Sequence, residues 1–304
     1  MTAGATARGA GPWLAFAFCS AVWGSTFLFI RIGNDTVPAV WGAAVRLALA
    51  AVLFAVIAAA LRAPWPRGSQ LAAALWFGVV DFGVSLPLLY WGEARVPSGL
   101  AAVLFATIPL TTSLLARLAG LEPLRPRILG ASVVAIGGVA LLFSASLEGS
   151  FEPSRLVAVW LAAATAALAG VLLKRAPGAH PFSMNAIAHA VGAVICVAAS
   201  RALGEQQEVP RGASWIPIGY LVVAGSIGAF GTFAWLLQRW PVTRTSFIAV
   251  IVPVVALVLG AAVRGERPAA TAVAGVLVIL GAVLAGQLAP GPTRGRAAGQ
   301  RPET

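Results

Sequence analysis

Long apolar runs separated by short polar or basic connections follow one another along the whole chain. Each run has about 17 to 25 residues, the length a helix needs to cross the hydrocarbon core of a bilayer. The runs are Trp13–Ile30, Pro38–Leu61, Leu71–Trp91, Pro97–Ala116, Ile128–Ser144, Leu156–Leu173, Phe182–Ala199, Trp215–Leu237, Thr245–Val263 and Ala269–Leu288. The pattern therefore predicts an all-α integral membrane protein with ten transmembrane helices and no soluble domain.

Composition agrees with a membrane protein and changes how the charge is interpreted. Of the 304 residues, 59% are hydrophobic and 10% are charged, whereas soluble domains carry about 25% charged residues. The net charge of +11 would suggest nucleic-acid binding in a soluble protein. In this chain the basic residues lie at the ends of the apolar runs, which is where they set membrane topology. We therefore predict no nucleic-acid partner.

The distribution of arginine and lysine predicts the orientation. With the N-terminus inside, thirteen basic residues fall in inner loops and tails and seven in outer loops, and an excess of basic residues marks the cytoplasmic side. Both termini are thus expected in the cytoplasm. Residues 1–12 form a short N-terminal tail in this scheme, and residues 289–304, which lack large apolar residues, form a disordered C-terminal tail.

The two halves of the chain repeat each other. A shift of 144 residues superposes seven markers on residues of the same type: Arg31 and Arg175, Trp91 and Trp235, Arg95 and Arg239, Pro97 and Pro241, Pro109 and Pro253, Glu122 and Glu266, Gly137 and Gly281. Residues 13–144 and 156–288 then form two repeats of five helices. Because five is odd, the second repeat has the opposite orientation in the membrane, and inverted repeats are typical of transporters.

Three stretches carry a resemblance to a known family. They are VWGSTFLFIR from Val22, IPLTTSLLARLAGLEPLRPRILGASVVAIGGVALLF from Ile108, and VPVVALVLGAAVRGERPAATAVAGVLVILGAVL from Val252. Together they resemble the EamA-type members of the drug/metabolite transporter superfamily, over about residues 13 to 288. The resemblance implies ten helices in two repeats, cytoplasmic termini, and export of metabolites, amino acids or drugs from the bacterial inner membrane. The second repeat departs from the pattern, since Ala167 and Leu168 stand opposite Trp23 and Gly24.

Two charged residues lie deep inside predicted spans. Arg46 is eight residues into its span and Asp81 lies at the middle of the third, and a charge at such a depth costs roughly 2.5–3.5 kcal/mol on insertion scales. A pair facing a central cavity is the simplest solution. It is either a static salt bridge or a site in which Arg46 binds an anionic group of the substrate and Asp81 binds a proton or an amine.

Other candidates for substrate contact are His189, Trp23, Trp235 and Tyr90. A shift of 143 residues places His189 opposite Arg46, and a histidine there could relay protons or remain neutral and bonded to a carbonyl. Trp23 and Trp235 lie deeper than the interfacial tryptophans, so they either line the cavity, where a cation could stack, or pack between helices.

Pro109 and Pro253 occupy equivalent mid-span positions. A proline there removes a backbone hydrogen bond, and such breaks in transporters often lie near the binding site. We therefore expect a hinge at each proline, with a fixed kink as the alternative.

The sequence thus predicts a secondary transporter, rather than an enzyme, in the bacterial inner membrane. It would export a small metabolite, amino acid or drug by alternating access, driven by a proton gradient or by the solute gradient alone, as a monomer or homodimer. The alternative is a carrier or flippase for a lipid-linked or sugar-phosphate compound. No cofactor or metal is predicted, because the chain has no GxxxxGK[ST] loop and no Cys/His spacing suited to a metal.

Overall fold

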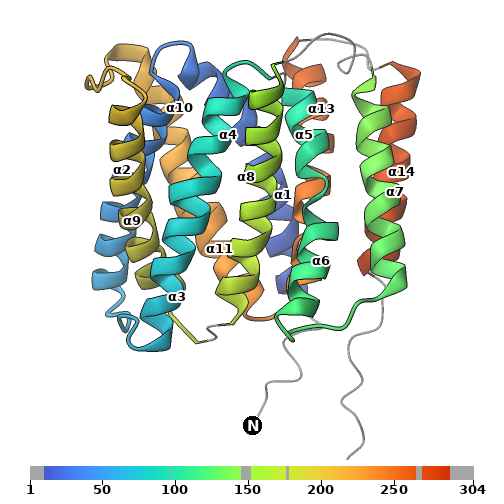
Figure 1. Ribbon diagram of the computed structural model, residues 1–304, viewed down its shortest axis with the longest axis horizontal. Helices are drawn as coiled ribbons and strands as arrows, with labels where there is room; N and C mark the ends of the chain where they lie inside the picture. Colours follow the sequence, from blue (N-terminus) through green and yellow to red (C-terminus); the bar gives the residue numbers. More distant parts are fainter. Residues whose placement is uncertain (1–9, 97, 145–151, 176–177, 265–268, 288–304) are drawn as a thin grey trace, which may run out of the picture.

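The structure is a computed structural model that describes residues 10–96, 98–144, 152–175, 178–264 and 269–287. In these ranges the secondary structure is entirely helical, and the long helices stand side by side as one bundle (Figure 1). The predicted tails 1–12 and 289–304 lie outside the described residues, except that α1 already begins at Ala10. The all-α prediction is therefore confirmed for the described part of the chain.

The helices follow the predicted runs closely. The uninterrupted ones are α1 (Ala10–Asn34), α2 (Ala39–Ala60), α7 (Pro126–Leu142), α8 (Pro153–Lys174), α9 (Pro181–Ala202) and α14 (Ala270–Gln287). The interrupted ones are α3 (Ser69–Phe77), η1 (Gly78–Ser85) and α4 (Leu86–Glu93); α5 (Ser98–Phe105) and α6 (Ile108–Leu118); η3 (Gly212–Ser214), α10 (Trp215–Tyr220), η4 (Leu221–Gly228) and α11 (Ala229–Leu237); and α12 (Val242–Thr245) and α13 (Ile248–Arg264).

Nine helical stretches of the described chain are long and apolar enough to cross a membrane. The remaining predicted run, Ile128–Ser144, corresponds to α7, a shorter apolar helix of 17 residues. Large apolar side chains such as Leu14, Val194 and Leu277 remain exposed on the bundle, as expected where lipid replaces water as the solvent. These features describe a multi-pass membrane protein.

Two π-helical segments interrupt the third and eighth predicted spans. They are η1 and η4, each of eight residues, and a shift of 143 residues superposes one on the other. π-Helices make up well under 1% of residues, so their coincidence in both halves reflects the repeat. Such segments occur frequently at functional sites, and η1 carries Asp81.

The fourth and ninth spans are broken rather than merely bent. The break between α5 and α6 lies at Ala106 and Thr107, so Pro109 falls in the first turn of α6, where its missing N–H costs little. The second break lies at Ser246 and Phe247, and Pro253 is inside the continuous helix α13. Both breaks therefore precede the prolines, and the expected hinge at each proline stays a prediction.

Close helix contacts depend on small residues. α2 packs along α9 at one edge of the bundle and α7 along α14 at the other (Figure 1). A Cβ on Gly275 would lie 2.6 Å from the Leu142 nitrogen, and one on Gly78 would lie 2.6 Å from the Ala188 oxygen. Glycine at these points lets backbones approach, and in the second case it seats η1 against α9.

Candidate functional site: a cavity between the two halves

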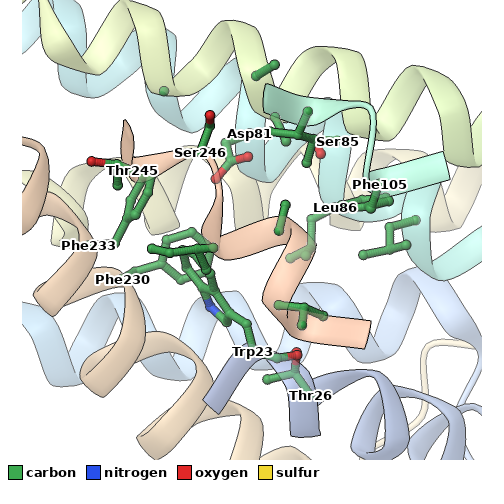
Figure 2. A pocket seen from close by; sticks show the side chains of 18 of the residues that line it. Trp23, Thr26, Asp81, Ser85, Leu86, Phe105, Phe230, Phe233, Thr245 and Ser246 are labelled. Carbon is green, nitrogen blue, oxygen red and sulfur yellow. The ribbon is translucent and has the colours of Figure 1, made fainter. Parts of the chain in front are cut away.

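A cavity of about 160 Å³ lies inside the bundle, lined by residues of both halves of the chain. The first half contributes α1, α2, η1, α4 and the α5–α6 break, and the second contributes α8, α11 and the α12–α13 break. Figure 2 shows the Asp81 carboxylate and the Ser246 hydroxyl near each other and the Trp23, Phe230 and Phe233 rings grouped together. Broken helices beside a central site are typical of secondary transporters.

Arg46 connects the two halves at the wall of this cavity. Its side chain is buried, with Nε donating to the Ser226 hydroxyl of η4 at 3.2 Å and Nη1 donating to the Tyr90 hydroxyl of α4 at 3.2 Å. A Cβ on Gly225 would lie 3.1 Å from Nη2, so glycine at this point of η4 makes room for the guanidinium. Both acceptors are neutral, and the positive charge remains available to a ligand.

Asp81 faces the same cavity but does not form the expected direct pair with Arg46. The ion pairs in the described chain are Glu152–Arg155 and Glu208–Arg211, and Asp81 and Arg46 both line the cavity. The physical reason is that the Arg46 guanidinium is oriented by the hydroxyls of Tyr90 and Ser226. Both residues line one cavity, no direct salt bridge joins them in the described chain, and their roles in binding stay predictions.

The rest of the wall is aromatic or hydroxylated. Trp23 packs against Phe230 and Phe233 with ring centroids 5.1 Å apart in both cases. Ser85 and Ser246 donate their hydroxyl protons to backbone carbonyls, each at 2.8 Å, so their oxygen lone pairs remain as acceptors. The cavity thus combines one acid and one base among its described lining residues with an apolar body.

Three predicted contact residues do not line the cavity. Tyr90 is buried behind Arg46 and holds it. Trp235 lies under the Arg239 guanidinium, 3.8 Å from its ring centroid. Trp235 is not among the described residues that line the cavity, and its role in substrate contact stays a prediction.

His189 is fully buried on α9 and does not line the cavity either. Its Nδ1 lies 2.9 Å from the Asn185 carbonyl oxygen, and since a carbonyl only accepts, Nδ1 carries the proton. Nε2 has no partner among the described residues, and the ring packs against Phe82 at 4.0 Å and Phe54 at 4.9 Å. This environment favours a neutral imidazole.

One contact between the halves and one within the second half lie at the end of the bundle at which α1 begins. The Glu122 carboxylate accepts hydrogen bonds from the Val242 backbone N–H at 2.6 Å and from the Thr243 hydroxyl. The Lys174 ammonium donates to the carbonyls of Leu237 and Trp240. Both contacts secure the turn between α11 and α12.

A second carboxylate joins the halves at the opposite end. Glu205, after α9, accepts from the backbone N–H groups of Val40 and Trp41 at 3.1 and 2.8 Å, at the start of α2. Acidic side chains are favourable at such helix starts. Glu266, the repeat counterpart of Glu122, lies outside the described residues.

Ser226 and Gly225 are site residues that the sequence did not suggest. They lie in an AGSIG stretch whose serine has no catalytic context. The available signal was the repeat itself, because the 143-residue shift places this stretch opposite Asp81. From the sequence alone, the Ser226 hydroxyl cannot be distinguished from serine hydroxyls that bond to their own helix. Only the tertiary structure shows that it accepts a hydrogen bond from Arg46.

Comparison with known proteins identifies the family. The model of the EamA-like transporter family matches residues 11–144 and again residues 154–285. The two matches together cover most of the chain. The chain belongs to the EamA-like transporter family, a membrane transporter family rather than an enzyme family.

Relatives share about a quarter to a third of their residues with this chain. The "Uncharacterized inner membrane transporter YedA" of Escherichia coli K12 is 29% identical over 81% of this chain and 80% of its own length. The "Probable terminal-alkyne amino-acid exporter" of Streptantibioticus cattleyicolor is 29% identical over 86% of this chain and 89% of its own. The "Probable amino-acid metabolite efflux pump" of Salmonella typhimurium is 25% identical over 85% and 89%.

A solved crystal structure shares the fold. It superposes with a TM-score of 0.78 at 17% sequence identity, over 92% of this chain and 99% of its own. At this identity the likeness concerns the architecture alone.

Proposed function

We propose that this protein is a secondary transporter that exports a small zwitterionic molecule, of the amino-acid type, across the bacterial inner membrane by alternating access. The observation that carries the proposal is the cavity between the halves, where Arg46 and Asp81 are the charged lining residues. Substrate sites of secondary transporters lie near the midplane between repeats. The relatives named as an amino-acid exporter and an amino-acid metabolite efflux pump support this direction and this class.

The chemistry of the lining supports such a substrate. A carboxylate group fits the free donor capacity of Arg46 through charge-assisted hydrogen bonds, and an ammonium group fits the Asp81 carboxylate. The apolar remainder of the molecule packs on Trp23, Phe230 and Phe233. At about 10–15 Å³ for each water-sized position, a cavity of about 160 Å³ accepts a molecule of small-metabolite size.

A carrier or flippase for lipid-linked or sugar-phosphate compounds is the second candidate. A phosphate monoester carries close to two negative charges, for which several basic groups are expected. Arg46 is the basic residue among the described lining residues, and Asp81 opposes a second negative charge. The balance of charge therefore favours a zwitterion over a phosphate.

Coupling and topology extend the proposal. Asp81 is the carboxyl that faces the cavity and serves as a proton or amine acceptor, whereas His189 is a weaker candidate because it is sealed among phenylalanines.

We further infer ten spans in two inverted repeats, with α7 as the fifth, residues 13–144 and 156–288 as the repeat units, and both termini in the cytoplasm. Pro109 and Pro253 remain candidate hinges beside the two helix breaks, and a monomer or homodimer is the expected assembly.

The first experiment compares metabolites inside and outside cells that express the wild type or Arg46→Ala at equal membrane levels. The matched control is Arg211→Ala, which removes an arginine whose side chain is 86% exposed and pairs with Glu208. We expect a solute with an amine and a carboxylate to accumulate outside with the wild type and the control only. Equal profiles for Arg46→Ala and the wild type would contradict the proposed site.

Purified protein in vesicles then separates a carrier from a channel. A carrier preloaded with unlabelled solute takes up labelled solute by counterflow and saturates as the solute concentration rises. Linear uptake without counterflow would exclude alternating access.

A further inference from the structure

Glu93 is a buried carboxyl that the site described above does not use. It ends α4, at the end of the bundle opposite the start of α1, and only 6% of its surface is exposed. Neither carboxyl oxygen has a hydrogen-bond partner among the described residues. Glu93 differs in this respect from Glu122 and Glu205, whose carboxylates each accept two hydrogen bonds at a helix start.

The packing around Glu93 keeps water away from it. One residue earlier, a Cβ on Gly92 would lie 3.3 Å from the Arg155 carbonyl oxygen of α8, so α4 and α8 are in close contact. The Arg155 guanidinium lies over the Trp91 ring at 3.6 Å and donates to the Trp91 carbonyl at 2.6 Å. The Arg155 guanidinium thus interacts with Trp91 and Glu152 and forms no ion pair with Glu93 in the described chain.

The other charged groups near Glu93 do not pair with it either. Arg31 of α1 acts on Glu93 through its positive charge but forms no ion pair with it in the described chain. The hydroxyl of Tyr90, one turn earlier on α4, accepts a hydrogen bond from Arg46 of α2. Asp81 of η1 faces the cavity.

A carboxylate anion without hydrogen bonds is strongly disfavoured in such a place, whereas the neutral acid is tolerated. We propose that Glu93 binds one proton when this end of the bundle closes and returns it to water when the end opens. The proton comes from the adjoining water and converts the carboxylate to a carboxylic acid, and reopening reverses the step. The inference rests on the proposed alternating access, in which this end opens and closes.

Linkage gives the sign of the pH dependence. The closed state holds one proton more than the open state in the window above about pH 4, where a solvated glutamate is ionised, and below the pH at which the buried carboxyl itself ionises. Within this window the equilibrium constant for closing rises about tenfold for each unit by which the pH falls. Acid on this side of the membrane favours closure, which links the return of the empty transporter to the proton concentration there.

Infrared spectroscopy of the purified protein in bilayers tests the proton directly. The wild type at neutral pH is expected to show a carbonyl-stretch band of a protonated carboxyl that exchanges slowly with heavy water. The band should lose intensity in Glu93→Gln by the same amount whether residue 81 is aspartate or asparagine, because Asp81 can hold a proton of its own, and it should be unchanged in Glu208→Gln. A band of unchanged intensity in Glu93→Gln, or no band in the wild type, would overturn the inference.

Distance measurements between spin labels on α1 and α8 at this end follow the closing equilibrium across pH. Glu93→Gln should remove its dependence on pH. Arg31→Gln, which leaves Glu93 in place if Glu93→Gln folds poorly, should shift the midpoint to higher pH because a positive charge near the carboxyl is lost. An unmoved midpoint would count against the proposal. The infrared band needs no substrate, so a protein that fails to transport but keeps the band contradicts the proposed function alone.

Discussion

Replacing Gly24 by alanine tests how closely α1 must approach α13. An alanine Cβ at this position would lie 2.5 Å from the Val255 Cβ and 3.0 Å from the Val252 carbonyl oxygen. Ordinary contacts begin near 3.4 Å, so the two helices must separate by several tenths of an ångström. Overpacking of this kind typically costs about 1–3 kcal/mol. Because Val252 lines the cavity, the separation also deforms the substrate site.

Gly33 on the same helix provides the matched control. A Cβ there would meet the Pro217 side chain at 3.8 Å, an ordinary contact. The gain in helix propensity on replacing glycine by alanine, about 1 kcal/mol, applies to both variants and cancels in the comparison. We therefore expect Gly24→Ala to be less stable than Gly33→Ala by about 1–3 kcal/mol.

Reversible unfolding in mixed micelles measures this difference. Midpoints and slopes of both variants are compared with those of the wild type, and transport is assayed at equal protein levels. Equal unfolding free energies, within about 0.5 kcal/mol, would refute the argument that Gly24 is required for close packing of α1 on α13.

Three further predictions concern the cavity. Ser226→Ala removes one acceptor from the buried Arg46 guanidinium; it should cost about 1.5–3 kcal/mol in substrate binding or stability, and calorimetric titration with the identified substrate measures it. Trp23→Phe should raise the half-saturation concentration for transport while Trp235→Phe leaves it unchanged, and the opposite ranking would place Trp235 in the site. Asp81→Asn should abolish proton coupling in vesicles while leaving the protein folded, and an unchanged pH dependence of transport would exclude Asp81 as the coupling residue.

Hydropathy and repeat symmetry were sufficient to predict the class of this protein. The length of each apolar run depends only on local composition, and a bilayer permits little besides a helix in such a run. The predicted runs therefore correspond to observed helices, and Arg46 and Asp81 stand out because charge is rare at that depth. Both indeed line one cavity.

The contacts within the site depend on how each helix is rotated and shifted along its axis, which the sequence of an apolar helix does not determine. Helix rotation and axial register are chosen by close packing rather than by burial from water, since lipid is as apolar as a neighbouring helix. For this reason the sequence could not show that Arg46 bonds to Tyr90 and Ser226 instead of pairing with Asp81. The sequence likewise could not show where the π segments and the two helix breaks lie.

Repeat symmetry also has a limit that only the tertiary structure reveals. Arg46 and His189 occupy equivalent positions, yet Arg46 lines the cavity and His189 is enclosed by phenylalanines. The sequence determined where charges enter the membrane and that two similar halves surround them. The packing of the halves decided which polar groups face the cavity, which position one another, and which, like Glu93, are left buried without a partner among the described residues.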